Sequence, residues 1–171
     1  KPLPRIDMLS KPSSAEQVNF RNWQALGQDN LVIGKVTSAA NGSLSVQFQL
    51  FDVYKGEQLT GFSIPANRSS LRGVAHRISD LIYEKLTGQK GAFSTRMAYV
   101  TSMPGANGQT EYKIQVADAD GYGAKTIVTS SEPVMSPAWS PRGDKISYVS
   151  YEGRRSSIYT QTLRTGQREK L

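Results

Sequence analysis

The chain has 171 residues, 37% of them apolar, and no cysteine, which excludes disulfides, thiol catalysis and cysteine-ligated metals. No stretch approaches the roughly 18 consecutive apolar residues of a membrane-spanning helix, so membrane insertion is not expected. The net charge is +7, yet residues 1–90 hold 11 basic and 7 acidic side chains and residues 91–171 hold 10 and 7. Nucleic-acid binding requires a basic patch or stripe, and the densest cluster here is only Arg154-Arg155. An evenly basic, solvated surface is therefore favoured over a nucleic-acid-binding module.

The first ten residues are rich in proline, and Pro2 and Pro4 are incompatible with a helix there. A helix is expected to begin at Ser14, because Ser14 and Gln17 have the spacing of a capping box, and to end before Gly27. Trp23 falls inside this helix and is interpreted as a core residue rather than as part of a ligand site.

Three strands follow, and the turn signals between them predict a meander. The strands are expected at residues 30–39, 43–54 and 57–64. Asn41-Gly42 is the strongest hairpin signal, because both residue types tolerate positive φ. The second strand alternates strictly between apolar and polar residues, which predicts one buried face. Phe51 and Val53 interrupt its polar face, so the end of this strand is expected to be covered on both sides.

The strongest helix prediction covers residues 70–87, where apolar residues recur at steps of three and four. Ser69 or Ser70 would cap it, and Gly88 would end it. Its apolar stripe is expected to cover the buried face of the second strand. After a short linker at 89–91 the period changes from 3.6 to 2, which places a domain boundary there. Residues 1–90 are thus predicted to form an α/β (α+β) domain with a mixed sheet and two helices, preceded by a further strand and helix.

Residues 136–171 have the pattern of four short antiparallel strands. A strand carrying Trp139 is followed by a turn at residues 140–143, in which Pro141 and Gly143 suit the turn positions, and by a second strand. A third strand is expected at 156–163, and Thr165-Gly166 turns the chain into a fourth at 167–171. Four strands in about 40 residues have the size of one β-propeller blade.

An earlier and looser copy of this pattern begins near residue 92. Three strand segments align between the copies, 92–94 with 138–140, 97–100 with 146–149, and 112–116 with 156–160, and the turn Asp120-Gly121 aligns with Thr165-Gly166. The offset stays between roughly 44 and 49 residues, which is a period expected of propeller repeats. Residues 91–171 are therefore predicted to be all-β, with two propeller repeats.

The string SPAWSPRGDKISYVS at residues 136–150 resembles the WD40-like repeat of the TolB family, periplasmic proteins of the Tol-Pal system. The segments KLTG at 85–88 and GAFST at 91–95 resemble the end of that family's amino-terminal α/β domain. One departure is visible, because the family usually has Asp where this chain has Arg142. An Asp can hydrogen-bond locally in the turn and Arg cannot, so the turn is expected to be less tightly held.

The resemblance implies a six-bladed propeller, of which two repeats are present. Two open blades would expose an apolar sheet face and strand edges, so the chain is expected to be a fragment of a longer protein. The family's role implies a non-enzymatic, periplasmic protein without a cofactor. It would bind the lipoprotein Pal through the propeller, and TolA and possibly other Tol proteins through the amino-terminal part. These contacts would support outer-membrane integrity and cell division.

The link at residues 130–135 is the candidate partner-binding site. It joins the outer strand of one repeat to the inner strand of the next, at the propeller face that binds Pal in the family. Glu132 would provide charge for steering, and Val134 and Met135 would be apolar groups at the rim. The alternative is that Val134 and Met135 simply complete the inner strand.

No catalytic constellation is found. His76 is interpreted as a boundary residue of the helix at 70–87, and Asp118-Ala119-Asp120-Gly121 as a turn after a strand, because the later ligands of a calcium loop are absent. An enzyme-class alternative remains, the propeller gate of a prolyl-oligopeptidase-type serine peptidase. It requires an α/β-hydrolase domain with Ser, Asp and His, which these residues do not contain.

Four aromatic residues in the second repeat could in principle form a stacking platform for nucleic acid. Packing between propeller sheets is the better interpretation, because large side chains fill the wedge between blades. The four residues are Trp139, Tyr148, Tyr151 and Tyr159.

Overall fold

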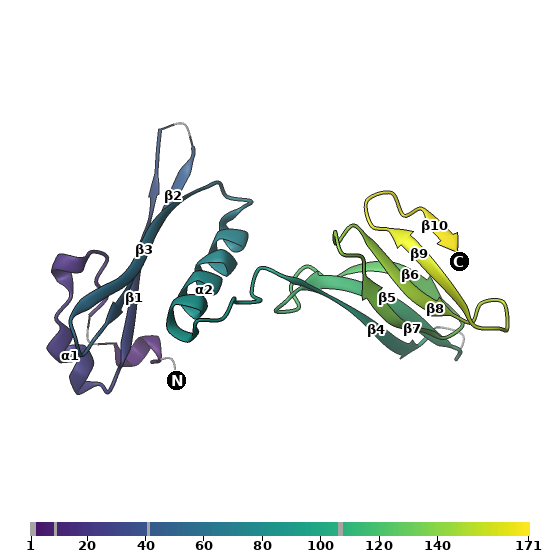
Figure 1. Cartoon of the computed structure of the whole chain (residues 1–171), viewed down its shortest axis with the longest axis horizontal. Coiled ribbons are helices and arrows are strands. Elements are labelled where there is room, and N and C mark those ends of the chain that lie inside the picture. The colour runs from purple at the N-terminus through teal and green to yellow at the C-terminus, as the bar shows by residue number, and fades with distance from the viewer. Residues whose placement is uncertain (1–2, 9, 41, 106–107) are drawn as a thin grey trace. The chain divides into compact units, whose positions relative to one another are not determined.

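The computed structural model describes residues 3–8, 10–40, 42–105 and 108–171. The chain divides into two units, Lys1–Ser94 and Thr95–Leu171. Figure 1 labels the helices and strands of both units.

The amino-terminal unit is a three-stranded antiparallel sheet with helical segments on both faces. Its elements in order are 3₁₀ turns at Arg5–Asp7 and Ala15–Gln17, α1 (Phe20–Ala25), β1 (Asn30–Ser38), β2 (Leu44–Asp52), β3 (Glu57–Ala66) and α2 (Leu71–Thr87). The strand order is β1-β2-β3, and both pairs are antiparallel. The predicted meander is confirmed, whereas a mixed sheet is wrong for the described strands. Their connections are too short for the crossover that a parallel pair requires.

Helix α2 covers one face of this sheet, as its apolar stripe predicts. Val74 packs against Phe48 of β2 and Ile64 of β3, and all three are buried. Gly88 has a φ of +74° and ends the helix, as expected. Ser70 lies at the N-cap position, as expected, but its side chain makes no capping hydrogen bond. Ser70 instead closes a turn with Asn67, whose Oδ1 accepts its N–H at 2.9 Å.

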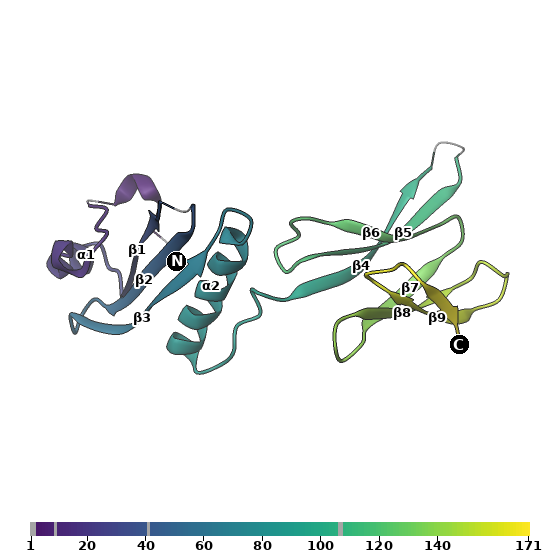
Figure 2. The same ribbon diagram turned by 90° about the horizontal axis from the view of Figure 1, so that it is seen from above.

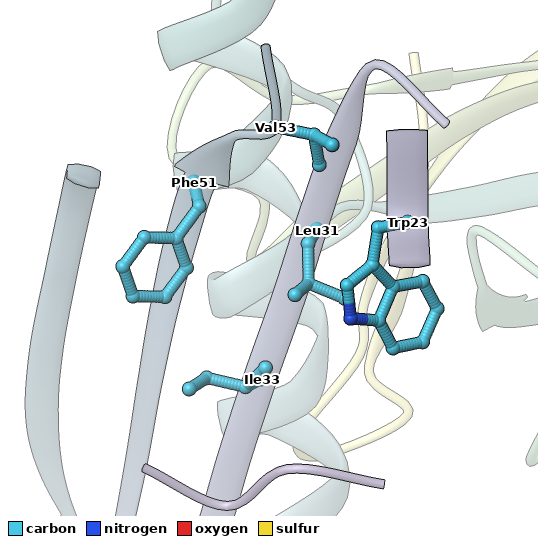
Figure 3. Close-up of a cluster of buried hydrophobic side chains, with 5 residues drawn as sticks. All are labelled: Trp23, Leu31, Ile33, Phe51 and Val53. Atoms are coloured by element: carbon cyan, nitrogen blue, oxygen red, sulfur yellow. The ribbon is translucent and has the colours of Figure 1, made fainter. Parts of the chain in front are cut away.

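The opposite face of the sheet carries a second core around Trp23. Figure 3 shows this indole beside Leu31, with Ile33, Phe51 and Val53 completing the cluster. Phe51 and Val53 are therefore covered, as expected for the end of β2, and Trp23 is a core residue at 3% exposure. Its Nε1 has no hydrogen-bond partner within the described part of the chain.

The single helix expected from Ser14 to Gly27 is not formed. The segment consists of the 3₁₀ turn Ala15–Gln17 and the six-residue α1, separated by extended backbone at Val18. The capping box is also absent, because the Gln17 Oε1 atom accepts the N–H of Ser13 at 2.9 Å and Ser14 makes no capping bond. The apolar residues of this segment are only loosely periodic. Packing Trp23 onto the sheet requires only a short helix, because tertiary packing supplies most of a helix's stability.

The β1–β2 hairpin lies where Asn41-Gly42 predicts it. Gly42 has a φ of +78°, and its N–H donates to the Ala39 carbonyl at 3.0 Å. Asn41 itself lies outside the described residues.

The carboxyl-terminal unit consists of two antiparallel sheets. Its strands are β4 (Arg96–Pro104), β5 (Thr110–Asp118), β6 (Lys125–Ser130), β7 (Val134–Trp139), β8 (Lys145–Ser150), β9 (Ser157–Thr162) and β10 (Arg168–Lys170). One sheet has the order β4-β5-β6 and the other β10-β9-β8-β7. Figure 2 labels these strands except β10, which Figure 1 labels beside the carboxyl terminus. Their facing sides share one apolar core, in which Ile114 of β5 meets Ile146 and Tyr148 of β8. The four strands predicted for 136–171 are confirmed.

The earlier copy lacks the strand expected at residues 92–94. This segment forms a turn that is held by α2, because Asp80 Oδ1 accepts the Phe93 N–H at 2.8 Å and Asp80 Oδ2 accepts the Ser94 N–H at 3.0 Å. The backbone donors that a strand would use are thereby occupied. The Phe93 ring also meets Tyr83 edge-on, with ring centroids 6.0 Å apart.

Gly91 allows the chain to approach α2 this closely. A Cβ at this position would overlap the Asp80 carboxylate and lie 2.8 Å from the Asp80 Cα. The Ser94 hydroxyl and the two backbone N–H groups lower the pKa of the Asp80 carboxyl. Asp80 is thus held as a carboxylate that anchors the end of the amino-terminal unit.

We expect Gly91→Ala to destabilise the amino-terminal unit by about 1–3 kcal/mol, because the added methyl group displaces the segment from Asp80. Gly73→Ala is the matched control. It lies in α2 with nothing within 4 Å of the new Cβ, and should stabilise by about 0.5–1 kcal/mol. Urea unfolding followed by Trp23 fluorescence in a Trp139→Phe background measures both. Equal effects of the two substitutions would contradict the close-approach argument.

We expect Asp80→Asn to cost about 1–2 kcal/mol at neutral pH, since an amide cannot accept both backbone N–H groups. The folded-state pKa of Asp80 is lowered, so its contribution is complete above the ordinary pKa near 4. That contribution is lost as the pH falls through the folded-state value. The difference in unfolding free energy between wild type and Asp80→Asn should therefore shrink below pH 4. A pH-independent difference would show that the charge plays no part.

Candidate protein-binding surface

The structure places the three predicted partner-binding residues in different surroundings. Glu132 is exposed in the β6–β7 loop, where its N–H donates to the Ser130 Oγ at 3.0 Å. Val134 is 3% exposed and belongs to the core between the two sheets. Met135 is 40% exposed. Successive strand residues point to opposite faces, so Val134 and Met135 cannot both reach the surface.

Met135 lies on the outer face of the four-stranded sheet, not at its rim. It pairs with Val149, which in turn pairs with Ile158 on β9. Ile158 is 50% exposed on the same face. The expected rim position is therefore corrected for Met135 and Val134, and only Glu132 lies in the loop itself.

A second loop, residues 151–156, lies against the loop of Glu132. The Tyr151 N–H donates to the Pro133 carbonyl at 3.1 Å, which joins the two loops directly. Within the second loop the Arg154 N–H donates to the Tyr151 carbonyl at 2.9 Å. Arg154 has a φ of +59°, a conformation that residues other than Gly and Asn seldom adopt. No sequence motif indicates this loop, although the Arg154-Arg155 pair lies in it.

Glu152 fixes the base of this loop to the neighbouring strands. Its Oε1 accepts from Arg168 Nη2 on β10 at 2.5 Å. The Arg168 guanidinium lies 3.7 Å from the centroid of the Tyr159 ring. The pKa of the Glu152 carboxyl is lowered first by the nearby Tyr159 hydroxyl and then by the Arg168 guanidinium. The nearby Glu152 carboxylate in turn raises the pKa of Tyr159. Glu152 is thereby engaged within the protein.

Buried polar groups continue this network into the core. Tyr148 stacks on Tyr159 with ring centroids 6.0 Å apart, and its hydroxyl donates to the Gln161 Oε1 at 3.4 Å. Burial raises the pKa of Tyr148. The Gln161 Nε2 donates to the Ile127 carbonyl on the other sheet at 3.0 Å. Tyr148 and Tyr159 are thus packing residues, as is Trp139, whereas Tyr151 is exposed.

The turn at residues 140–143 lies at the opposite end of the sheet. Gly143 has a φ of +68°, and its N–H donates to the Ser140 carbonyl at 2.9 Å. The Ser140 hydroxyl accepts the Lys145 N–H and donates to the Asp144 Oδ1 at 2.8 Å, which lowers the pKa of Asp144. Local hydrogen bonds therefore close this turn without an Asp at 142, and the Arg142 side chain is 86% exposed.

The remaining residues considered in the sequence, His76 and Asp118 to Gly121, lie in a helix and in a turn. His76 is half-buried on α2. Asp118 to Gly121 begin the β5–β6 turn, where the Gly121 N–H donates to the Asp118 carbonyl at 2.8 Å, as predicted. Among the described residues, no helix has the length and apolar character needed to cross a membrane.

Comparisons with known proteins match both halves of the chain. A family model described as the TolB amino-terminal domain matches residues 1–59, and one described as the TolB beta propeller domain matches residues 83–171.

Similar proteins match along nearly the whole chain. A Tol-Pal system protein TolB from Nitrosococcus oceani is 51% identical, covering 99% of this chain and 39% of that protein. One from Xylella fastidiosa is 47% identical, covering 98% of this chain and 38% of that protein. The crystal structure of TolB from Acinetobacter baumannii has a TM-score of 0.85 at 38% identity, covering 98% of this chain and 41% of that one. The chain thus spans less than half the length of each of these relatives.

Proposed function

This chain belongs to the TolB family, and from that premise we propose that it acts as a non-enzymatic protein-binding part of the Tol-Pal system in the periplasm. The observation that carries the proposal is the order of the two matched domains in one chain, which the relatives share over almost all of these residues. The relatives' names describe a Tol-Pal component and no reaction, in agreement with the expectation that the chain is not an enzyme.

In this proposal the chain has two domains. Residues 1–90 form the TolB-like amino-terminal domain, and residues 91–171 form the first two repeats of a six-bladed propeller. The two face-to-face sheets of the carboxyl-terminal unit support this assignment, because propeller blades pack in that way. In the whole protein the remaining blades would cover the outer face that carries Met135 and Ile158.

The partners in this proposal are Pal, bound through the propeller, and TolA and other Tol proteins, bound through the amino-terminal part. Binding of this kind would hold the outer membrane to the rest of the envelope and support cell division. A peptidase gate is disfavoured, because residues 1–59 match the TolB amino-terminal domain and a peptidase gate does not require such a domain.

Glu132 is the predicted binding residue that the structure leaves in an exposed loop. We expect the intact protein to bind Pal, and Glu132→Arg to weaken that binding about tenfold by reversing a charge at the interface. Surface plasmon resonance with immobilised Pal measures the affinity. Glu57→Arg, an exposed residue at the start of β3, is the control for the change in charge and should leave binding unchanged.

Melting curves of both variants should match the unsubstituted protein. Failure of the unsubstituted protein to bind Pal would contradict the proposed function. Equal loss with Glu57→Arg would show a general charge effect and remove Glu132 from the interface.

A further inference from the structure

The loop at residues 151–156 adds exposed aromatic and basic side chains to the surface around Glu132. We infer that Tyr151, Arg154 and Arg155, joined to the loop of Glu132, form a preorganised docking surface for a partner protein that presents carboxylates. This inference rests on the proposed function, because it specifies the chemistry of the surface that a Tol-Pal partner would need.

The backbone of the loop is held in an unfavourable conformation. Among the described residues, Ser136 and Arg154 are the non-glycine residues with positive φ, at +55° and +59°. Ser136 lies at the irregularity of β7, where pairing with β8 shifts between Met135 and Ala138. Arg154 ends the turn that begins at Tyr151, at the position where the turns beginning at Ser140 and Asp118 have Gly143 and Gly121. Strain of this kind persists where surrounding contacts enforce it, and it is concentrated at functional sites.

Several contacts enforce the loop conformation before any partner arrives. The Tyr151 N–H bonds to Pro133, the Arg154 N–H bonds to Tyr151, and the Glu152 carboxylate is paired with Arg168. Because the loop is already ordered, binding does not have to order it, and that saving favours affinity.

The charges left for a partner are mainly positive. Arg168 and Tyr159 engage Glu152, so its charge is compensated internally. Arg154 and Arg155 are exposed, and neither has an ion pair or a side-chain hydrogen bond within the described part of the chain. Tyrosine and arginine are the residue types enriched at the energetic centres of protein interfaces, and Tyr151 is 36% exposed beside them.

A protein partner fits this surface better than nucleic acid does. The Pro133–Tyr151 hydrogen bond joins the loop of Glu132 to the loop of the arginines, so the two loops together carry exposed charges of both signs. A phosphate backbone would be repelled at Glu132, whereas a folded protein can place a carboxylate and a cation in register. The two signs thus select a partner and fix its orientation.

Pal is the probe for the test, with affinity measured at several salt concentrations. We expect Arg154→Glu/Arg155→Glu to weaken binding at least tenfold at low salt and to flatten the salt dependence. The matched control is Arg142→Glu/Arg164→Glu, which makes the same charge change in exposed turns at the opposite end of the sheet and should bind normally.

Arg154→Gly separates binding from folding. Glycine adopts a φ of +59° without strain, so this variant should melt at the same or a higher temperature while binding Pal less tightly. A merely structural role for Arg154 would leave Pal affinity unchanged.

The outcomes distinguish this inference from the proposed function. No binding by the unsubstituted protein contradicts the proposed function, and with it the basis of the inference. Normal Pal binding by Arg154→Glu/Arg155→Glu contradicts the inference alone. Steeply salt-dependent binding of duplex DNA that these two substitutions abolish, with Pal binding intact, would assign the arginines to nucleic acid and overturn it.

Discussion

The side chain of Gln161 is the polar constraint on which the carboxyl-terminal unit depends. It is 8% exposed, so leaving its amide unpaired would cost about 1–3 kcal/mol. Its Nε2 donates to the Ile127 carbonyl of the facing sheet, and its Oε1 accepts from Tyr148. Apolar packing alone would tolerate some sliding of one sheet over the other, but the bond to Ile127 forms at one alignment only, and the bond from Tyr148 within the same sheet orients the amide for it. The sheets are therefore held in register by one buried amide.

The same constraint extends from the core to the surface loop. Tyr148 is held by Gln161 and stacks on Tyr159, and the Arg168 guanidinium that lies over the Tyr159 ring pairs with Glu152. From Tyr148 through Tyr159 to Arg168 and Glu152, the groups become progressively more exposed. A loop built on such a support can present its charged residues in a fixed arrangement, as binding loops on rigid scaffolds do.

The sequence predicts the elements whose signals are local. Strict alternation located β2, the apolar stripe located α2, and Gly88 and Gly143 marked the ends and turns correctly. Signals that depend on distant partners failed. The strand expected at 92–94 is absent because the carboxylate of Asp80, which lies 13 residues before Phe93 in the sequence, accepts the backbone N–H groups of Phe93 and Ser94. The helix expected at 14–27 is broken for a similar reason, since packing onto the sheet decides its length.

The candidate surface shows the same division between local and distant information. Exposure of Glu132 followed from its loop, but the orientation of Met135 depends on the register of β7 with β8. Arg154-Arg155 was visible as a basic pair, yet its meaning depends on a backbone angle and on the pairing of Glu152 with Arg168. Gly91, in the family-like GAFST string, is by contrast explained by the close approach of Asp80. A family-like string can thus reflect packing, while a less distinctive loop carries the features of a binding surface.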